Sequence, residues 1–479
     1  MPNSYNSRSW RTARIRLAAV LAVSAVFTSI SPAAEQVDLI VRGGTIVTMD
    51  AQRRVVENGA VAVRRGVVAA VGPADDVLAQ FAAPQTLEAR GRLVVPGLVN
   101  THGHAAMSLM RGLADDRALM DWLQNYIFPA EARVVDEEFV RVGTRLACCE
   151  MLLGGTTTYA DMYYFEQAVA EETAQAGMRG VLGQTVIDFP APDFKTWDAA
   201  LAGCEAFLVR WKDHPLIVPA VAPHAPYTVS PEHLQAARAL ANRHHAPLVI
   251  HVAETKSEVA TIRERHQASP VAHLERLGLF DGATLANHCV WTDDADLALL
   301  AKRGAGVAHC PQSNMKLASG IAPVPKMLAL RIAVGLGTDG AASNNDLDLW
   351  EEIDAAAKLH KAFSGDPTVI SAREAFAMAT IEGARALGLA DRIGSIEVGK
   401  QADLATIALD APHVAPLYDV YSHLAYSVKA GDVRSVLVAG RVVVDERRPT
   451  NLDVRKTLAE AAEQRVRILA ALKKPGPAR

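Results

Sequence analysis

The feature that most constrains the fold is a repeated alternation of short apolar runs with longer amphipathic segments from Pro96 to Leu389. The runs include GVLGQTVI, LIVPAVAP, APLVIHVAE, ATLANHCV, GAGVAHCP and IAVGLGTD. Repeated strand and helix units favour a parallel sheet whose faces are both covered. The chain of 479 residues is long enough for a large α/β barrel with an appendage, and this is the fold that we predict.

Both ends of the chain carry a different pattern, in which apolar and polar residues alternate around glycine turns. The pattern runs through VDLIVRGGTIVTMD and GAVAVRRGVVAAVG, and it returns in GSIEVGKQADLATIAL and VRSVLVAGRVVVDE. Such alternation is typical of short, half-exposed antiparallel strands. We therefore predict that residues 35–93 and 395–450 pair into one small β-sandwich domain. Residues 94–394 would form the barrel, and residues 451–479 a C-terminal helix and tail.

Residues 1–34 have the three-part layout of a secretory signal peptide. Four arginines between Arg8 and Arg16 precede an apolar run from Leu17 to Ile30, and small residues follow the run. The run is shorter than the ~20 residues that a membrane span requires. We therefore expect export to the periplasm without stable membrane association after cleavage. An uncleaved anchor, or a start-site artefact that leaves the protein cytoplasmic, is the alternative.

The overall charge bears on the ligand. The formal net charge of -4 provides no basic field for nucleic acid, so we expect a small-molecule ligand. The five cysteines form no spaced framework, and they therefore do not decide the redox compartment.

Side chains that bind metals end several of the apolar runs. His102 and His104 in NTHGHA are two residues apart, so a strand would point both to the same face. An isolated pair of this kind is a weak signal, but His251 and Asp339 also end predicted strands. Imidazoles and a carboxylate at one barrel mouth suit Zn²⁺ or a similar divalent ion with an open position for water. We predict that His102, His104, His251 and Asp339 hold one divalent ion, with Zn²⁺ as the expected metal.

Two further strand-end residues, Glu254 and His288, remain free to move protons. They would exchange protons with a water molecule bound to the ion. Binding lowers the pKa of this water from ~15.7 to ~7, so that it can attack an electrophilic carbon. Glu254 lies three residues after His251, and a continued strand would point it away from the site. The hypothesis therefore requires the chain to turn into a loop directly after His251.

Several of these stretches together resemble the amidohydrolase superfamily: PGLVNTHGHAAMSLMRG, the H-x-x-E at His251, the strand-ending His288, and TDGAASNN. Members of that superfamily are metal-dependent barrels flanked by a β-sandwich from both chain ends. The resemblance thus implies an α/β fold, a (β/α)8 TIM barrel with this small domain. Some binuclear members carry a bridging lysine on the fourth strand, whereas this chain has His224 in VAPHAPYTVSP. The resemblance therefore points to the mononuclear branch, which is rich in deaminases.

Three further stretches closely resemble the deaminases of 5′-methylthioadenosine and S-adenosylhomocysteine: LMDWLQNYIFPAEARV, HCPQSNMKLASGIAPVPKML and GTDGAASNNDLDLWEEI. This resemblance implies a homo-oligomer that replaces the 6-amino group of an adenine nucleoside by oxygen and releases ammonia. It also implies that Glu131 binds the ribose hydroxyls, that His224 contacts the nucleoside, and that Glu254 binds and protonates the ring. His288 and Asp339 would orient the attacking water and take its proton. Judged by spacing alone, Glu131 fits equally a carboxylate that stabilises a helix start.

The amino acid tail of S-adenosylhomocysteine calls for a cation, and arginine suits its carboxylate best. The sequence between Arg179 and Arg210 contains no further arginine and a single lysine, Lys195. Arg179 is therefore the candidate for binding the carboxylate of the substrate. Its position equally fits a helix end that leads into a strand, where a cation interacts favourably with the helix dipole. This scarcity favours 5′-methylthioadenosine or adenosine as the substrate.

Two other functions stay open on the sequence. Another ring aminohydrolase or chlorohydrolase, acting on guanine, cytosine, a pterin or an s-triazine, would share the metal ligands. A catalytically inactive binding protein could also use this fold. A role of Glu131 in activity would argue against the other ring hydrolases, because only a nucleoside offers a ribose for it to bind. Bound metal would argue against an inactive binding protein.

Overall fold

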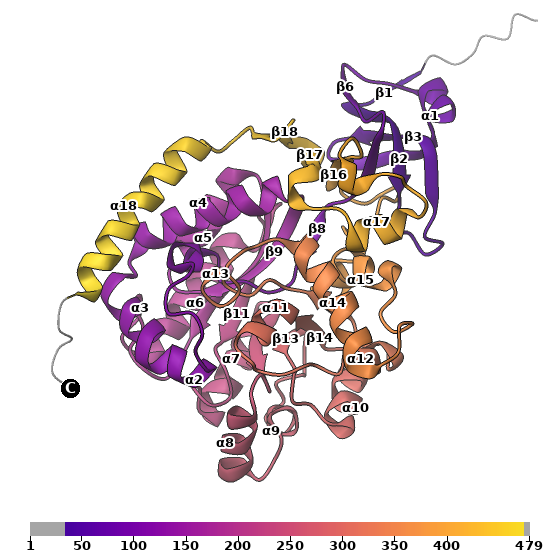
Figure 1. Cartoon of the computed structure of the whole chain (residues 1–479). Helices are drawn as coiled ribbons and strands as arrows, with labels where there is room; N and C mark the ends of the chain where they lie inside the picture. Colours follow the sequence, from indigo (N-terminus) through magenta and orange to yellow (C-terminus); the bar gives the residue numbers. More distant parts are fainter. Residues whose placement is uncertain (1–33, 474–479) are drawn as a thin grey trace, which may run out of the picture.

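The central sheet has eight parallel strands, as seen in the computed structural model, which describes residues 34–473 (Figure 1). The strands follow one another in chain order: β8 (Leu98–Asn100), β9 (Thr156–Tyr163), β10 (Arg179–Val186), β11 (Ile217–Pro223), β12 (Leu248–Val252), β13 (Thr284–His288), β14 (Gly306–His309) and β15 (Val334–Leu336). The first and last strands meet where the N–H of Thr101 donates to the carbonyl of Leu336 at 2.8 Å. The sheet is thus nearly closed, and the predicted barrel is confirmed.

Helices follow the strands and cover the outside of the barrel (Figure 1). The main ones are α4 (Glu137–Leu153), α5 (Glu166–Ala176), α6 (Trp197–Trp211), α7 (Pro231–Arg243), α8 (Lys256–His266), α10 (Asp294–Arg303) and α14 (Leu349–Ser364). Asp136 and Thr196 cap α4 and α6, because their side chains accept hydrogen bonds from backbone N–H groups of the first turn. Two short helices, α2 (Leu119–Trp122) and α3 (Phe128–Val134), lead from β8 to α4, and each places a side chain in the pocket described below.

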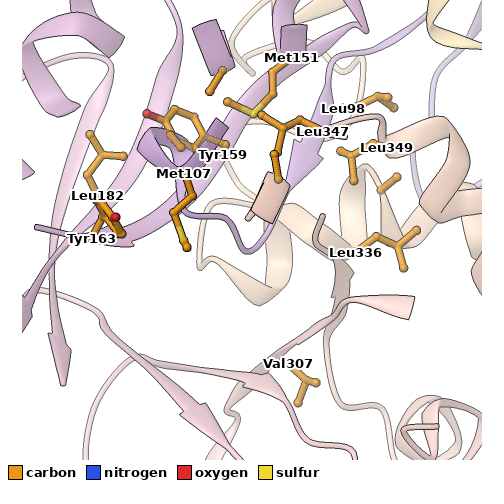
Figure 2. Close-up of a cluster of buried hydrophobic side chains, with 14 of the residues drawn as sticks. Leu98, Met107, Met151, Tyr159, Tyr163, Leu182, Val307, Leu336, Leu347 and Leu349 are labelled. Carbon is orange, nitrogen blue, oxygen red and sulfur yellow. The ribbon is translucent and has the colours of Figure 1, made fainter. Parts of the chain in front are cut away.

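The barrel strands are buried on both faces, which explains their nearly continuous apolar sequences. Val249 and Leu285 share one buried cluster with Ala160 inside the barrel. Tyr159 and Leu182 belong to the larger cluster that includes Met151 of α4, part of which is shown in Figure 2. Since both faces are occupied by packing, the open ends of the strands are left for polar side chains.

The two chain ends together build a nine-stranded sheet beside the barrel (Figure 1). Its N-terminal strands are β2 (Leu39–Val47), β3 (Val55–Arg64), β4 (Val67–Pro73), β6 (Gln85–Glu88) and β7 (Arg92–Pro96). Its C-terminal strands are β16 (Leu404–Ala408), β17 (Val433–Val438), β18 (Arg441–Asp445) and β19 (Arg448–Pro449). The two sets join where β7 pairs antiparallel with β16. The predicted β domain of both chain ends is therefore present, and a two-stranded sheet of β1 (Glu35–Gln36) and β5 (Phe81–Ala82) adjoins it.

The last described helix, α18 (Val454–Leu472), packs along α3 and α4 (Figure 1). The predicted signal peptide, apart from Ala34, lies outside the described residues, as does the end of the predicted tail. Within residues 34–473, none of the helices combines the length and the apolar character needed to cross a bilayer.

Candidate active site

The carboxyl-terminal rim of the barrel brings the four predicted metal ligands together. The ring centroid of His102 lies 4.9 Å from that of His104 and 5.0 Å from that of His251. Oδ1 of Asp339 lies 3.4 Å from Nε2 of His102 and 3.3 Å from Nε2 of His104. The ligand atoms of His102, His104 and His251 lie within 4.8 Å of one another, and so do those of His102, His288 and Asp339. The ligand atoms are therefore close enough together to bind a single metal ion.

The hydrogen bonds of the histidines fit a divalent cation. Nδ1 of His104 bonds to the carbonyl of Met162 at 2.7 Å, and Nδ1 of His251 bonds to the carbonyl of His224 at 2.8 Å. Each carbonyl accepts a hydrogen bond from the Nδ1–H group, so Nε2 keeps its lone pair for a metal. Nε2 of His102 is buried and has no hydrogen-bond partner among the described residues. A buried nitrogen without a partner is costly unless a ligand satisfies it.

Asp339 is held by three donors. The hydroxyls of Ser313 and Ser343 donate to Oδ2 at 2.6 and 2.9 Å, and the N–H of Gly340 donates to Oδ1 at 2.8 Å. Burial raises the pKa of Asp339, but His102 and His104 outweigh it and hold that pKa well below its ordinary value. The carboxylate is therefore ionised. Sequence reasoning missed both serines, although they lie in quoted stretches, because serine is common at helix starts.

Glu254 reaches the same rim because the chain turns sharply after β12. The strand ends at Val252, and Ala253 adopts a left-handed backbone with φ +52°. Oε2 of Glu254 then lies 3.8 Å from Nε2 of His288, and both side chains are buried. The turn required by the sequence hypothesis is thus confirmed. Strained backbone of this kind clusters at functional sites.

The neighbours of Glu254 and His288 prepare both groups for proton transfer. Burial raises the pKa of Glu254, although His288 opposes this effect. Nδ1 of His288 lies 3.1 Å from Oδ1 of Asn314. With Nδ1 donating to that amide oxygen, Nε2 is the free nitrogen that faces Glu254. A carboxyl group whose pKa is raised by burial therefore stands next to an imidazole nitrogen that faces it at 3.8 Å.

A pocket opens above this cluster, and it contains the remaining predicted contacts except Arg179. Its wall includes Glu131, His224, Tyr163 and apolar side chains such as Trp122 and Phe128. Glu131 stands in the first turn of α3 yet is buried, and burial raises its pKa to about 7. The hydroxyl of Tyr163 donates to Oε1 of Glu131 at 2.7 Å. Sequence reasoning missed Tyr163, although it ends β9 and the strand-end rule would have found it.

Arg179 does not lie at this rim. It is the first residue of β10, at the opposite end of the barrel, and it is buried. Its guanidinium donates to both carboxylate oxygens of Asp403 at 3.0 and 3.3 Å, and to the carbonyl of Pro215 at 3.1 Å. The prediction that Arg179 binds substrate is therefore wrong. Lys195, the other cation of that window, donates to the carbonyls of Ala191 and Pro192.

A parallel barrel with histidines and an aspartate at its carboxyl-terminal rim defines the class of metal-dependent barrel hydrolases. The chain belongs to the amidohydrolase family, since the sequence model described as "Amidohydrolase family" matches residues 93–443. The resemblance seen in the sequence is thereby confirmed.

Individual relatives narrow the comparison. The chain is 49% identical over 438 residues to the 5-methylthioadenosine/S-adenosylhomocysteine deaminase of Syntrophobacter fumaroxidans, covering 91% of this chain and 99% of that protein. It is 45% identical over 408 residues to the protein of the same name from Thermodesulfovibrio yellowstonii, covering 85% and 93%. Among solved structures, an adenosine deaminase from Xanthomonas campestris with bound zinc superposes with a TM-score of 0.89 at 41% identity, covering 91% of this chain and all of that chain. The family and the histidine cluster together indicate a hydrolase that uses a divalent metal.

Proposed function

We propose that this protein is a metal-dependent deaminase of adenine nucleosides, which releases ammonia from C6 and leaves the inosine-type product. The observation that carries the proposal is one pocket whose lining combines side chains of the metal-binding cluster with two carboxyl groups: His104, His251, Asp339, Glu254 and Glu131. The names of the relatives support the same reaction, because both sequence relatives and the solved structure are called deaminases of adenine nucleosides.

We propose His102, His104, His251 and Asp339 as the ligands of one Zn²⁺ ion. The unpartnered Nε2 of His102 and the ionised Asp339 support this assignment, and the solved relative contains zinc. When bound, a divalent ion supplies a water molecule whose pKa is lowered to ~7. All other steps depend on side chains of this chain.

Glu254 is the proposed proton donor to N1 of the purine. Burial raises its pKa and so favours the protonated form, and protonation of N1 makes C6 electrophilic. His288 and Asp339 orient the water and take its proton as the oxygen adds to C6. The amino group of the resulting tetrahedral carbon then takes the proton held by His288 or Asp339 and leaves as ammonia, while the hydroxyl proton on C6 returns to Glu254 as the carbonyl forms. The donor and the acceptors stand in different environments, as the two opposite proton transfers require.

Glu131 is proposed to accept hydrogen bonds from the two ribose hydroxyls, with Tyr163 holding the carboxylate in place. For Glu131→Gln we expect KM for adenosine to rise about 10- to 100-fold, the usual cost of weakening hydrogen bonds to a charged group. Turnover of free adenine, if measurable, should not change. Steady-state kinetics with Glu138→Gln, an exposed carboxylate on α4, as the control would test this expectation. An unchanged KM in Glu131→Gln would mean that the ligand is not a nucleoside.

The titration of Glu131 predicts the direction in which KM for nucleosides changes with pH. Because the pKa of Glu131 is raised to about 7, the group gains a proton as the pH falls and accepts hydrogen bonds less strongly. KM for nucleosides is therefore expected to rise between about pH 8 and about pH 6. The Glu131→Gln variant, whose amide does not titrate, should lack this rise.

Ammonia release from a substrate panel tests the function directly. The zinc-loaded protein is incubated with adenosine, 5′-methylthioadenosine, S-adenosylhomocysteine, guanine and cytosine, and the ring absorbance is followed in parallel. We expect 5′-methylthioadenosine and adenosine to exceed S-adenosylhomocysteine, because Arg179 is committed to Asp403 at the far end of the barrel. Absence of activity on all three adenine nucleosides would refute the proposal.

We also propose that the protein is exported to the periplasm, that residues 1–34 are removed, and that the mature enzyme is a homo-oligomer free of the membrane. The basic residues before the apolar run of Leu17 to Ile30 support export. Cell fractionation with N-terminal sequencing tests this proposal, and light scattering gives the oligomeric state. A cytoplasmic protein that retains its leader would contradict export.

A further inference from the structure

Glu258 lies in the first turn of α8, directly beneath the turn that carries Glu254. Its Oε1 accepts the N–H of Ala253 at 2.8 Å, and its Oε2 accepts the N–H of Glu254 at 2.8 Å. The side chain is only 4% exposed. One buried carboxylate therefore binds two successive amides of the turn in which Ala253 is left-handed.

The local sequence predicts a different arrangement. Thr255 and Glu258 have the spacing of a capping box, in which the third residue of the helix binds the N–H of the N-cap residue. The structure has this arrangement at α10, where Asp296 accepts the N–H of Asp293 at 3.3 Å, and at α15 (Ala372–Met378). In α8, Thr255 accepts the N–H of Glu258 at 3.2 Å, but the carboxylate of Glu258 is directed to the two residues before Thr255. The cap of α8 is thereby coupled to the rim of the pocket.

The same turn is also tied to the strand that supplies His288. The carbonyl of Ala253 accepts the N–H of Trp291 at 2.8 Å, and the carbonyl of Val252 accepts the N–H of Cys289 at 3.0 Å. Glu258 therefore holds one side of the turn, and the segment after His288 holds the other. The distance between Glu254 and His288 depends on both.

We propose that Glu258 is a positioning residue for the reaction, whose carboxylate holds the turn of Ala253 and Glu254 so that Glu254 faces His288 and the substrate ring. The proposal rests on the role given to Glu254 above. A left-handed conformation is unfavourable for alanine, so the turn needs partners that compensate. Glutamine in place of Glu258 would offer one acceptor oxygen, and its NH₂ group would face the second amide donor.

The first test is the kinetics of Glu258→Gln, with Asp296→Asn as the matched control. Asp296 is likewise buried and stands at the same helix position, but it serves an ordinary capping box, and its Oδ1 accepts the hydroxyl of Ser269 rather than an amide of the active-site turn. We expect kcat of Glu258→Gln to fall about 10- to 100-fold, with little change in KM or in bound metal. The limb of the kcat–pH profile that reports Glu254 should also shift. If Glu258→Gln does not fold, Glu258→Asp, which keeps both acceptor oxygens, is measured instead. An unchanged kcat, or a loss equal to that of Asp296→Asn, would overturn the proposal.

A second readout does not depend on activity. Hydrogen exchange at the amides of Ala253 and Glu254 is expected to be at least about 10-fold faster in Glu258→Gln than in the wild type or in Asp296→Asn. Equal exchange in all three proteins would overturn the proposal. The wild-type protein could deaminate no nucleoside while hydrogen exchange at these two amides still becomes faster in Glu258→Gln. In that case the proposed function would be wrong, but Glu258 would still be shown to hold the turn.

Discussion

Replacement of Glu254 by glutamine is expected to lower kcat for adenosine about 10³-fold, within the usual contribution of general acid catalysis. The amide has nearly the same shape and can hydrogen-bond to the purine, but it cannot transfer a proton to N1. KM should therefore change little. Stopped assays of ammonia release on purified variants measure both constants.

The control for this experiment is Glu264→Gln, an exposed carboxylate on the same helix α8 that is expected to leave kcat unchanged. A loss of less than about tenfold in Glu254→Gln would place the proton donor elsewhere. The site offers a reason to expect the large effect, because Glu254 is buried and its carboxylate lies 3.8 Å from the free nitrogen of His288.

Removal of the metal is expected to lower kcat/KM at least about 10³-fold, and added Zn²⁺ should restore the activity. The water would lose the ion that lowers its pKa, and no side chain of the pocket can supply that effect. His102→Ala should have the same outcome without a chelator, since Nε2 of His102 has no other hydrogen-bond partner among residues 34–473. Elemental analysis should then find little metal per chain.

Metal loss should also destabilise the fold, because a ligand that binds only the native state stabilises it. A lower thermal midpoint on chelation, restored by Zn²⁺, is the expected result. His423→Ala is the control, because His423 lies on α17 (Val420–Tyr426), away from the site, and its ring bonds to the carbonyl of Asp419, the N-cap residue of that helix. Full activity of metal-free protein would refute the metal site.

The sequence predicted the barrel, the β domain and the residues of the metal-binding cluster, and it did so for local reasons. Strand periodicity predicted His102 and His104 on one face of a strand, but β8 ends at Asn100, so both lie in the segment that follows the strand. The parallel order of the strands brings that segment and the ends of β12 and β15 to the same rim. The alternation of side chains along a strand predicted that the chain must turn before Glu254, because Glu254 lies three residues after His251. The prediction that Arg179 binds substrate relied on the charge of its side chain. Its position contradicts that role, because the first residue of a parallel barrel strand lies at the end away from the site.

The pattern along the chain specifies most of the chemical groups that reach the rim, because repeated strands and helices set where each strand ends. The partner that each polar group meets follows from tertiary packing. Ser313 donates to Asp339, 26 residues away, and Arg179 pairs with Asp403, 224 residues away. Glu258 binds the turn of Glu254 although its spacing from Thr255 predicts a capping box. Hydrogen bonds act over about 3 Å, so their partners are set by how distant segments pack and not by the pattern along the chain.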